Sequence, residues 1–121
     1  MQSILNISDV NADRVHLRAL IVINSQHHIF EEHFPEMKIV PGAVIVGFIA
    51  QCIKVHFWKY TGISSFITLK KIVFLKPLLS HCYPRIDLSI SGKAGYAEVK
   101  FIIEDETGRF CQGVFQSKGE S

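Results

Sequence analysis

The chain has 121 residues, of which 48% are hydrophobic and 20% charged, and its formal net charge is +2. This length fits one domain with a hydrophobic core of its own. The composition excludes intrinsic disorder, and 13 basic against 11 acidic residues give no electrostatic reason to expect nucleic acid as a partner. A mean hydropathy of +0.23 is high for so short a chain, so we expect one surface to be buried in a membrane or against a partner.

The membrane alternative fails on length. The longest apolar stretch, residues 39–53, is interrupted by Pro41 and Gln51, whereas a membrane span needs about 20 mainly apolar residues. No basic segment precedes an apolar one at the N-terminus, so we expect no signal peptide. Cys52, Cys82 and Cys111 fit neither a disulfide framework nor a CxxC metal site, which indicates reduced thiols in a cytoplasmic protein.

Taken in chain order, the pattern predicts a strand, a loop, one long helix and then only strands. Residues 14–23 alternate and then become solidly apolar, which predicts a strand entering a core; residues 24–34 read as an ordered loop. Residues 43–60 are apolar on nearly every side in their first eleven positions, which predicts an enclosed helix ending near Gly62.

After the helix, segments 66–76, 85–91, 96–104 and 109–117 read as strands, the last three joined by turns at 92–95 and 105–108. Helix and strands are segregated along the chain, so the fold class is α+β with a mostly antiparallel sheet in a single domain, residues 1–121. One helix that is apolar on most sides needs a sheet wrapped around it.

The segment that indicates chemistry runs from residue 33 to residue 51, HFPEMKIVPGAVIVGFIAQ. His33 stands beside a rigid Phe-Pro step. Nine residues later Gly42 opens the helix, where free backbone N–H groups and the positive end of the helix dipole bind a carbonyl or an oxyanion. A base beside such a donor is the arrangement needed to remove a proton alpha to a thioester carbonyl.

This pattern, HFPxxxxxPGxxxxxxxAQ, resembles the signature of the FabZ/FabA-type 3-hydroxyacyl-acyl-carrier-protein dehydratases. Lys76-Pro77 after the next strand also stands in the family's place, and the resemblance covers residues 15–117. It implies a hot-dog fold that dimerises edge to edge. It further implies elimination of water from a 3-hydroxyacyl thioester, carried by acyl-carrier protein or coenzyme A, to give a trans-2-enoyl thioester in fatty-acid or polyketide-type biosynthesis.

The resemblance also assigns roles to residues. His33 falls on the catalytic histidine and Gly42 on the glycine whose amide holds the thioester carbonyl. Gln51 falls on the glutamine that supports the site. Phe34, Pro35 and Pro41 shape the loop in front of the substrate. The reaction needs only an acid, a base and an oxyanion donor, so no cofactor is implied.

One departure from the family is chemical. The family's catalytic acid, a Glu or Asp that serves the opposite subunit, belongs 14 residues after the histidine, and this chain has Gly47 there. Four explanations stay open. A different hot-dog subunit supplies the acid in a heterodimer; Glu31, Glu32, Glu36 or a water held by Gln51 replaces it; the chemistry is thioester hydrolysis; or the chain is an inactive subunit or acyl-binding protein.

Other candidate residues have plainer interpretations. We expect His16, His56 and His81 to be structural or at the surface, and His27 with His28 shows no metal-ligand spacing, so no metal site is expected. We expect Cys52 to pack in the core. We expect the helix aromatics to form core or tunnel wall rather than a stacking platform for bases; they are Phe48, Phe57, Trp58 and Tyr60. Four basic residues mark either a solvated strand edge or a docking surface for acidic acyl-carrier protein: Lys70, Lys71, Lys76 and Arg85.

Overall fold

The computed structural model describes residues 3–32, 38–61, 67–93 and 96–118. Within them lie six strands: β1 (Leu5–Ala12), β2 (His16–Ile23), β3 (Ile67–Phe74), β4 (Arg85–Lys93), β5 (Tyr96–Asp105) and β6 (Gly108–Lys118). A short helix, α1 (Ile29–Glu32), and a long one, α2 (Gly42–Thr61), separate β2 from β3. No helix in the described ranges is long and apolar enough to cross a bilayer.

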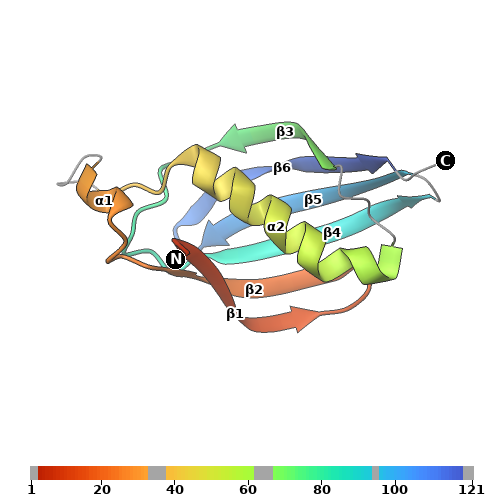
Figure 1. Cartoon of the computed structure of the whole chain (residues 1–121), viewed down its shortest axis with the longest axis horizontal. Coiled ribbons are helices and arrows are strands. Elements are labelled where there is room, and N and C mark those ends of the chain that lie inside the picture. The colour runs from red at the N-terminus through yellow and green to blue at the C-terminus, as the bar shows by residue number, and fades with distance from the viewer. Residues whose placement is uncertain (1–2, 33–37, 62–66, 94–95, 119–121) are drawn as a thin grey trace.

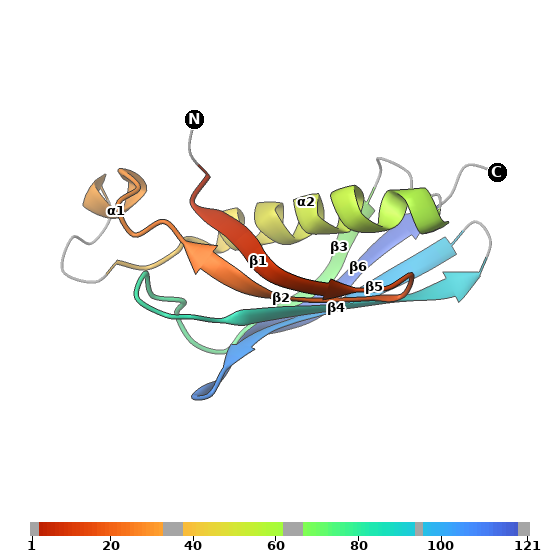
Figure 2. The same cartoon turned by 90° about the horizontal axis from the view of Figure 1, so that it is seen from below.

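The strands form one antiparallel sheet in the order β1-β2-β4-β5-β6-β3, and α2 lies along one face of it (Figure 1). Seen after a 90° turn, α2 lies over one face of the sheet, and no helix of the described ranges lies over the opposite face (Figure 2). The predicted α+β class and the central helix are therefore confirmed, with bounds within one residue of those expected. The two ends of the sheet are β1 and β3.

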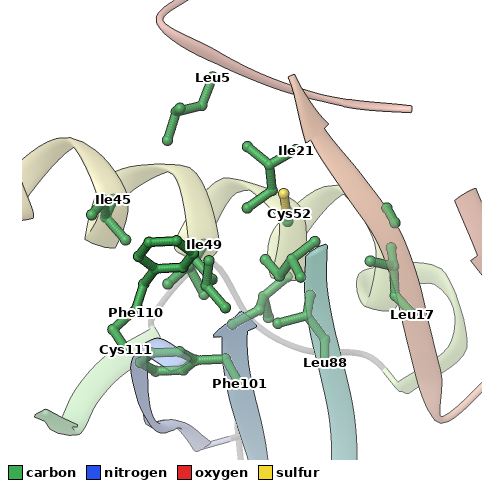
Figure 3. Close-up of a cluster of buried hydrophobic side chains, with 14 of the residues drawn as sticks. Leu5, Leu17, Ile21, Ile45, Ile49, Cys52, Leu88, Phe101, Phe110 and Cys111 are labelled. Carbon is green, nitrogen blue, oxygen red and sulfur yellow. The ribbon is translucent and has the colours of Figure 1, made fainter. Parts of the chain in front are cut away.

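One stripe of α2 forms the centre of the core. Ile45, Ile49, Ile53 and Phe57 recur every four residues, and each is at most 3% exposed. They pack against inward side chains of the sheet such as Leu88 and Phe101 (Figure 3). Full burial of such a side chain contributes about 1.5–3 kcal/mol, so this stripe fixes the helix on the sheet.

The opposite side of α2 is not enclosed, which corrects the expectation of a helix covered on most sides. Its exposed positions are Ala43, Gly47, Gln51, Lys54 and Val55. Val55 alone is 61% exposed. The apolar residues on this side misled the sequence interpretation because period alone does not distinguish a core contact from a surface left for a partner.

Two elements and one pairing were not predicted. β1 was missed because LNISDVNA has little apolar alternation, and α1 lies inside the segment expected to be loop. β3 pairs with β6 at the end of the sheet, not with β4, so residues 75–84 cross from one side of the sheet toward the other.

A β-bulge in β3 decides which of its side chains face the helix. Before the bulge, Leu69 pairs with buried Phe115; the register then shifts between Leu69 and Lys71, and Phe74 pairs with buried Cys111. Directly opposed residues of an antiparallel pair share a face, so the extra residue turns Phe74 toward α2. Without the bulge, its neighbour Val73 would take that place.

Candidate functional site

The start of α2 presents unpaired backbone donors. Val44 and Ile45 donate their N–H groups to the carbonyl of Pro41 at 3.0 and 3.2 Å, which closes the first turn. The N–H groups of Gly42 and Ala43 precede these bonds and have no acceptor within the helix. Together with the positive end of the helix dipole, they can stabilise negative charge on a carbonyl oxygen.

A cavity of about 460 Å³ lies beside this helix start. Gly42 and Ile45 of α2 form one side of it, and β3, the segment after β3 and β6 form the other. Its walls are mostly apolar and include Ile39, Val40, Phe74, Leu75, Lys76, Pro77, Leu78 and Phe110. Such a cavity suits an acyl group, with the donors of Gly42 at its edge.

Gly42 is tightly covered on the cavity side. A Cβ atom placed on Gly42 would lie 3.1 Å from Cζ of Phe74, because the tip of the ring points at the helix start. Phe74 nevertheless keeps 49% of its surface exposed. A side chain here would have to displace the ring, so the glycine lets the aromatic wall and the backbone donors lie side by side.

Gly47 and Gln51 lie on a different side of α2. Gly47 lies five positions after Gly42, which places the two residues about 140° apart around the helix axis. Gly47 and Gln51 are both exposed, and a Cβ on Gly47 would meet nothing within 4 Å. The structure thus brings Gly42, but not Pro41, to the lining of the cavity, and leaves Gly47 and Gln51 facing outward.

Other predicted site residues lie outside the described residues. His33, Phe34, Pro35 and Glu36 fall in the gap 33–37, and the side chain of Glu32 is also outside the described part. Glu31, the remaining substitute acid, is exposed on α1. The aromatic cavity residues Phe74 and Phe110 were not predicted; only the neighbouring Lys76-Pro77 step, noted for its match to the family pattern, pointed to this segment.

Among the helix aromatics, Phe57 is fully buried in the core and Phe48 is half-buried against it, while the side chains of Trp58 and Tyr60 fall outside the described part.

Burial raises the pKa of the Cys52 and Cys111 thiols to about 11, so neither is a nucleophile at neutral pH. The rings of His27 and His28 stack at 4.4 Å. In the described ranges, no three His, Cys, Asp or Glu side chains are placed to share a metal ion.

Two of the four basic residues considered for docking are engaged within the chain. Lys70 donates to Glu98 at 3.3 Å, and Lys76 lies 3.8 Å from Asp105. The hydrogen bond from Thr107, and then the positive charge of Lys76, hold the pKa of Asp105 below its usual value. These pairs reduce the charge that this side of the molecule offers to an acidic carrier protein.

Comparison with known proteins finds a family whose model matches most of this chain. The family model described as ApeI-like, ApeI dehydratase, matches residues 8–114. No curated protein sequence matches the chain significantly.

Several solved structures share the fold. The dehydratase heterocomplex ApeI:P from Xenorhabdus doucetiae has a TM-score of 0.69 at 13% identity, over 98% of this chain and 100% of that one. Cj0977, a sigma28-regulated virulence protein from Campylobacter jejuni, has a TM-score of 0.68 at 12% identity, over 98% and 85%. The fluoroacetyl-CoA thioesterase FlK has a TM-score of 0.60 at 12% identity, over 89% and 88%. The fold is therefore the hot-dog fold that the sequence resemblance implied.

Proposed function

Because the chain belongs to the ApeI-like dehydratase family, we propose that it is one subunit of a 3-hydroxyacyl-thioester dehydratase whose catalytic acid comes from a second hot-dog subunit. The observation that carries this proposal is the contrast between two glycines of α2. Gly42 borders an apolar cavity with free backbone donors, whereas Gly47, at the position that the FabZ/FabA-type resemblance assigns to the catalytic acid, faces open space.

In this proposal the thioester carbonyl accepts hydrogen bonds from the first N–H groups of α2, and the acyl chain occupies the cavity beside Gly42. His33 removes the alpha proton, and the electron pair forms the double bond as the β-hydroxyl departs. That hydroxyl takes a proton from the partner's acid and leaves as water. Base, oxyanion donor and acid suffice for this elimination, so no cofactor takes part.

The surface of the protomer supports a partner. Among the described residues, no strand lies beside the outer edge of β3, and Phe74 and Leu75 at its end are 49% and 53% exposed. The open side of α2 around Gly47 and Val55 adds further uncovered apolar surface. Pairing of β3 with an edge strand of another hot-dog subunit would cover these groups, and the ApeI:P heterocomplex is a relative of this fold that is itself built from unlike chains.

Product analysis tests the proposed function. The chain is incubated with a 3-hydroxyacyl thioester, alone and with candidate hot-dog partners, and both enoyl product and free thiol are measured. We expect enoyl thioester from a mixture, no free thiol, and a rate at least about 100-fold lower after His33→Ala, the usual effect of losing a general base. Thiol release would favour a thioesterase, and no product in any mixture would favour an acyl-binding or inactive subunit.

A further inference from the structure

Three backbone hydrogen bonds attach the segment after β3, residues 75–78, to two other parts of the molecule. The carbonyl of Phe110, at the start of β6, accepts hydrogen bonds from the N–H groups of Leu75 at 2.8 Å and Lys76 at 3.4 Å. Further along, Leu78 is 1% exposed and its carbonyl accepts the N–H of Val40 at 2.8 Å. Residues 75–78 therefore join β6 to the residues that lead into α2.

The contact with the residues before α2 is a small ladder of its own. Ile39 and Leu79 form an antiparallel bridge, flanked by the bond from Val40 to Leu78 and a 2.8 Å bond from the Ser80 N–H to the Lys38 carbonyl. Pro41 and Gly42 follow directly. The position of residues 75–80 thus sets where the chain enters α2, and with it where the Gly42 donors lie.

Lys76 fixes this segment through its side chain. Its ammonium lies 4.5 Å above the centre of the Phe110 ring and 3.8 Å from Oδ1 of Asp105, and it donates a hydrogen bond to Oγ1 of Thr107. Thr107 in turn donates its hydroxyl to Asp105 at 2.5 Å. The ammonium is thereby held over the turn between β5 and β6 by a cation–π contact, an ion pair and a hydrogen bond.

Phe110 connects this contact to the cavity. The ring is 3% exposed, forms part of the cavity wall beside Gly42, and lies next to Ile45 and Ile49 of α2 (Figure 3). The same residue therefore receives the Lys76 ammonium on its ring and the Leu75 and Lys76 amides on its carbonyl. Movement of Lys76 would loosen one wall of the cavity and the segment that holds Val40.

We propose that Lys76 is a positioning residue of the dehydratase site: clamped over Phe110 by Thr107 and Asp105, it holds residues 75–80 so that they fix the entry into α2 and the shape of the cavity beside Gly42. It acts through these neighbours and takes no part in proton transfer. The structural part of this inference stands without the proposed function; its effect on catalysis rests on that function.

Hydrogen exchange tests the structural part. In Lys76→Met, which keeps the aliphatic stem, the amides of Val40 and Ser80 should exchange at least about 10-fold faster, while that of Leu88 in β4 is unchanged. Lys76→Arg should restore the wild-type rates. Arg18→Met is the matched control, because Arg18 also forms an ion pair, with Asp87 at 3.1 Å, yet lines no part of the cavity. Unchanged exchange at Val40 in Lys76→Met, or equal acceleration in Arg18→Met, would overturn the positioning role.

Kinetics of the assembled enzyme test the catalytic part. We expect kcat/KM to fall about 10-fold in Lys76→Met, to recover within two-fold in Lys76→Arg, and to stay unchanged in Arg18→Met. A normal kcat/KM in Lys76→Met would refute the positioning of the site. Should the assembled protein have no dehydratase activity, the exchange measurement still decides whether Lys76 holds the entry into α2, so the two proposals fail separately.

Discussion

Replacing Gly47 with alanine tests whether the glycine is required for the stability of the isolated protomer or for binding of the partner subunit. Glycine inside a helix costs about 0.8–1.0 kcal/mol relative to alanine, and a Cβ at this position would meet no atom within 4 Å. No packing inside the protomer compensates for this cost. We therefore expect Gly47→Ala to raise the free energy of unfolding of the isolated chain by about 0.8 kcal/mol, and the unfolding temperature by about 3–4 °C.

The assay is denaturant unfolding of the isolated chain, at a concentration where sedimentation shows it to be monomeric. Gly42→Ala is the control on the same helix: its Cβ would lie 3.1 Å from Phe74, so no comparable gain is expected. If a partner side chain occupies the space at Gly47, the same Gly47→Ala chain should bind that partner more weakly. A loss of stability in the isolated Gly47→Ala chain would refute the reasoning, because it would mean that the protomer itself requires the glycine.

Three further predictions follow from the core and the charged turn. Gly113→Ala places a Cβ 2.1 Å from the Lys71 carbonyl and 2.6 Å from Phe101, so it should cost about 3 kcal/mol in denaturant unfolding; a loss under 1 kcal/mol would contradict the tight packing of β3 on β6. At pH 8 in native protein, a maleimide should label half-buried Cys82 well before Cys52 and Cys111, whose pKa is raised to about 11 by burial; three equal labelling rates would disprove this. The pKa of Asp105 is lowered from 3.8 in the folded chain, so its stabilisation is complete above pH 3.8 and is lost as the pH falls through the folded pKa. Asp105→Asn should therefore flatten the acid-unfolding curve below about pH 4, and an unchanged curve would count against the Thr107–Lys76 contacts.

The sequence was sufficient to predict the helix and the strands that follow it. Segment 85–91 alternates with Ile86, Leu88 and Ile90 inward, and all three are buried in β4. β1 was not predictable in the same way, because its exposed and polar residues carry almost no period. The pairing of β3 with β6 depends on contacts distant in sequence, which local patterns do not encode.

The candidate site was predictable only in part, for a physical reason. The Pro41-Gly42 step predicts the start of a helix and its free backbone N–H donors, because proline and glycine restrict or free the local backbone conformation. The aromatic wall depends on the bulge between Leu69 and Lys71, which turns Phe74 inward, and no turn residue marks it in the sequence. Gly47 faces outward because the sheet covers another side of α2. The first part of α2 is apolar on nearly every side, so its sequence does not show which side packs on the sheet.

The most direct test of the account is the dehydration rate of a 3-hydroxyacyl thioester by the wild-type chain alone and in complex with an acid-bearing hot-dog partner. In the proposed mechanism, this chain supplies the base and the oxyanion donor, and its partner supplies the acid. We therefore expect a rate about 100- to 10,000-fold higher in the complex, the range that a positioned general acid contributes. An isolated chain that dehydrates the substrate as fast as the complex would contradict it.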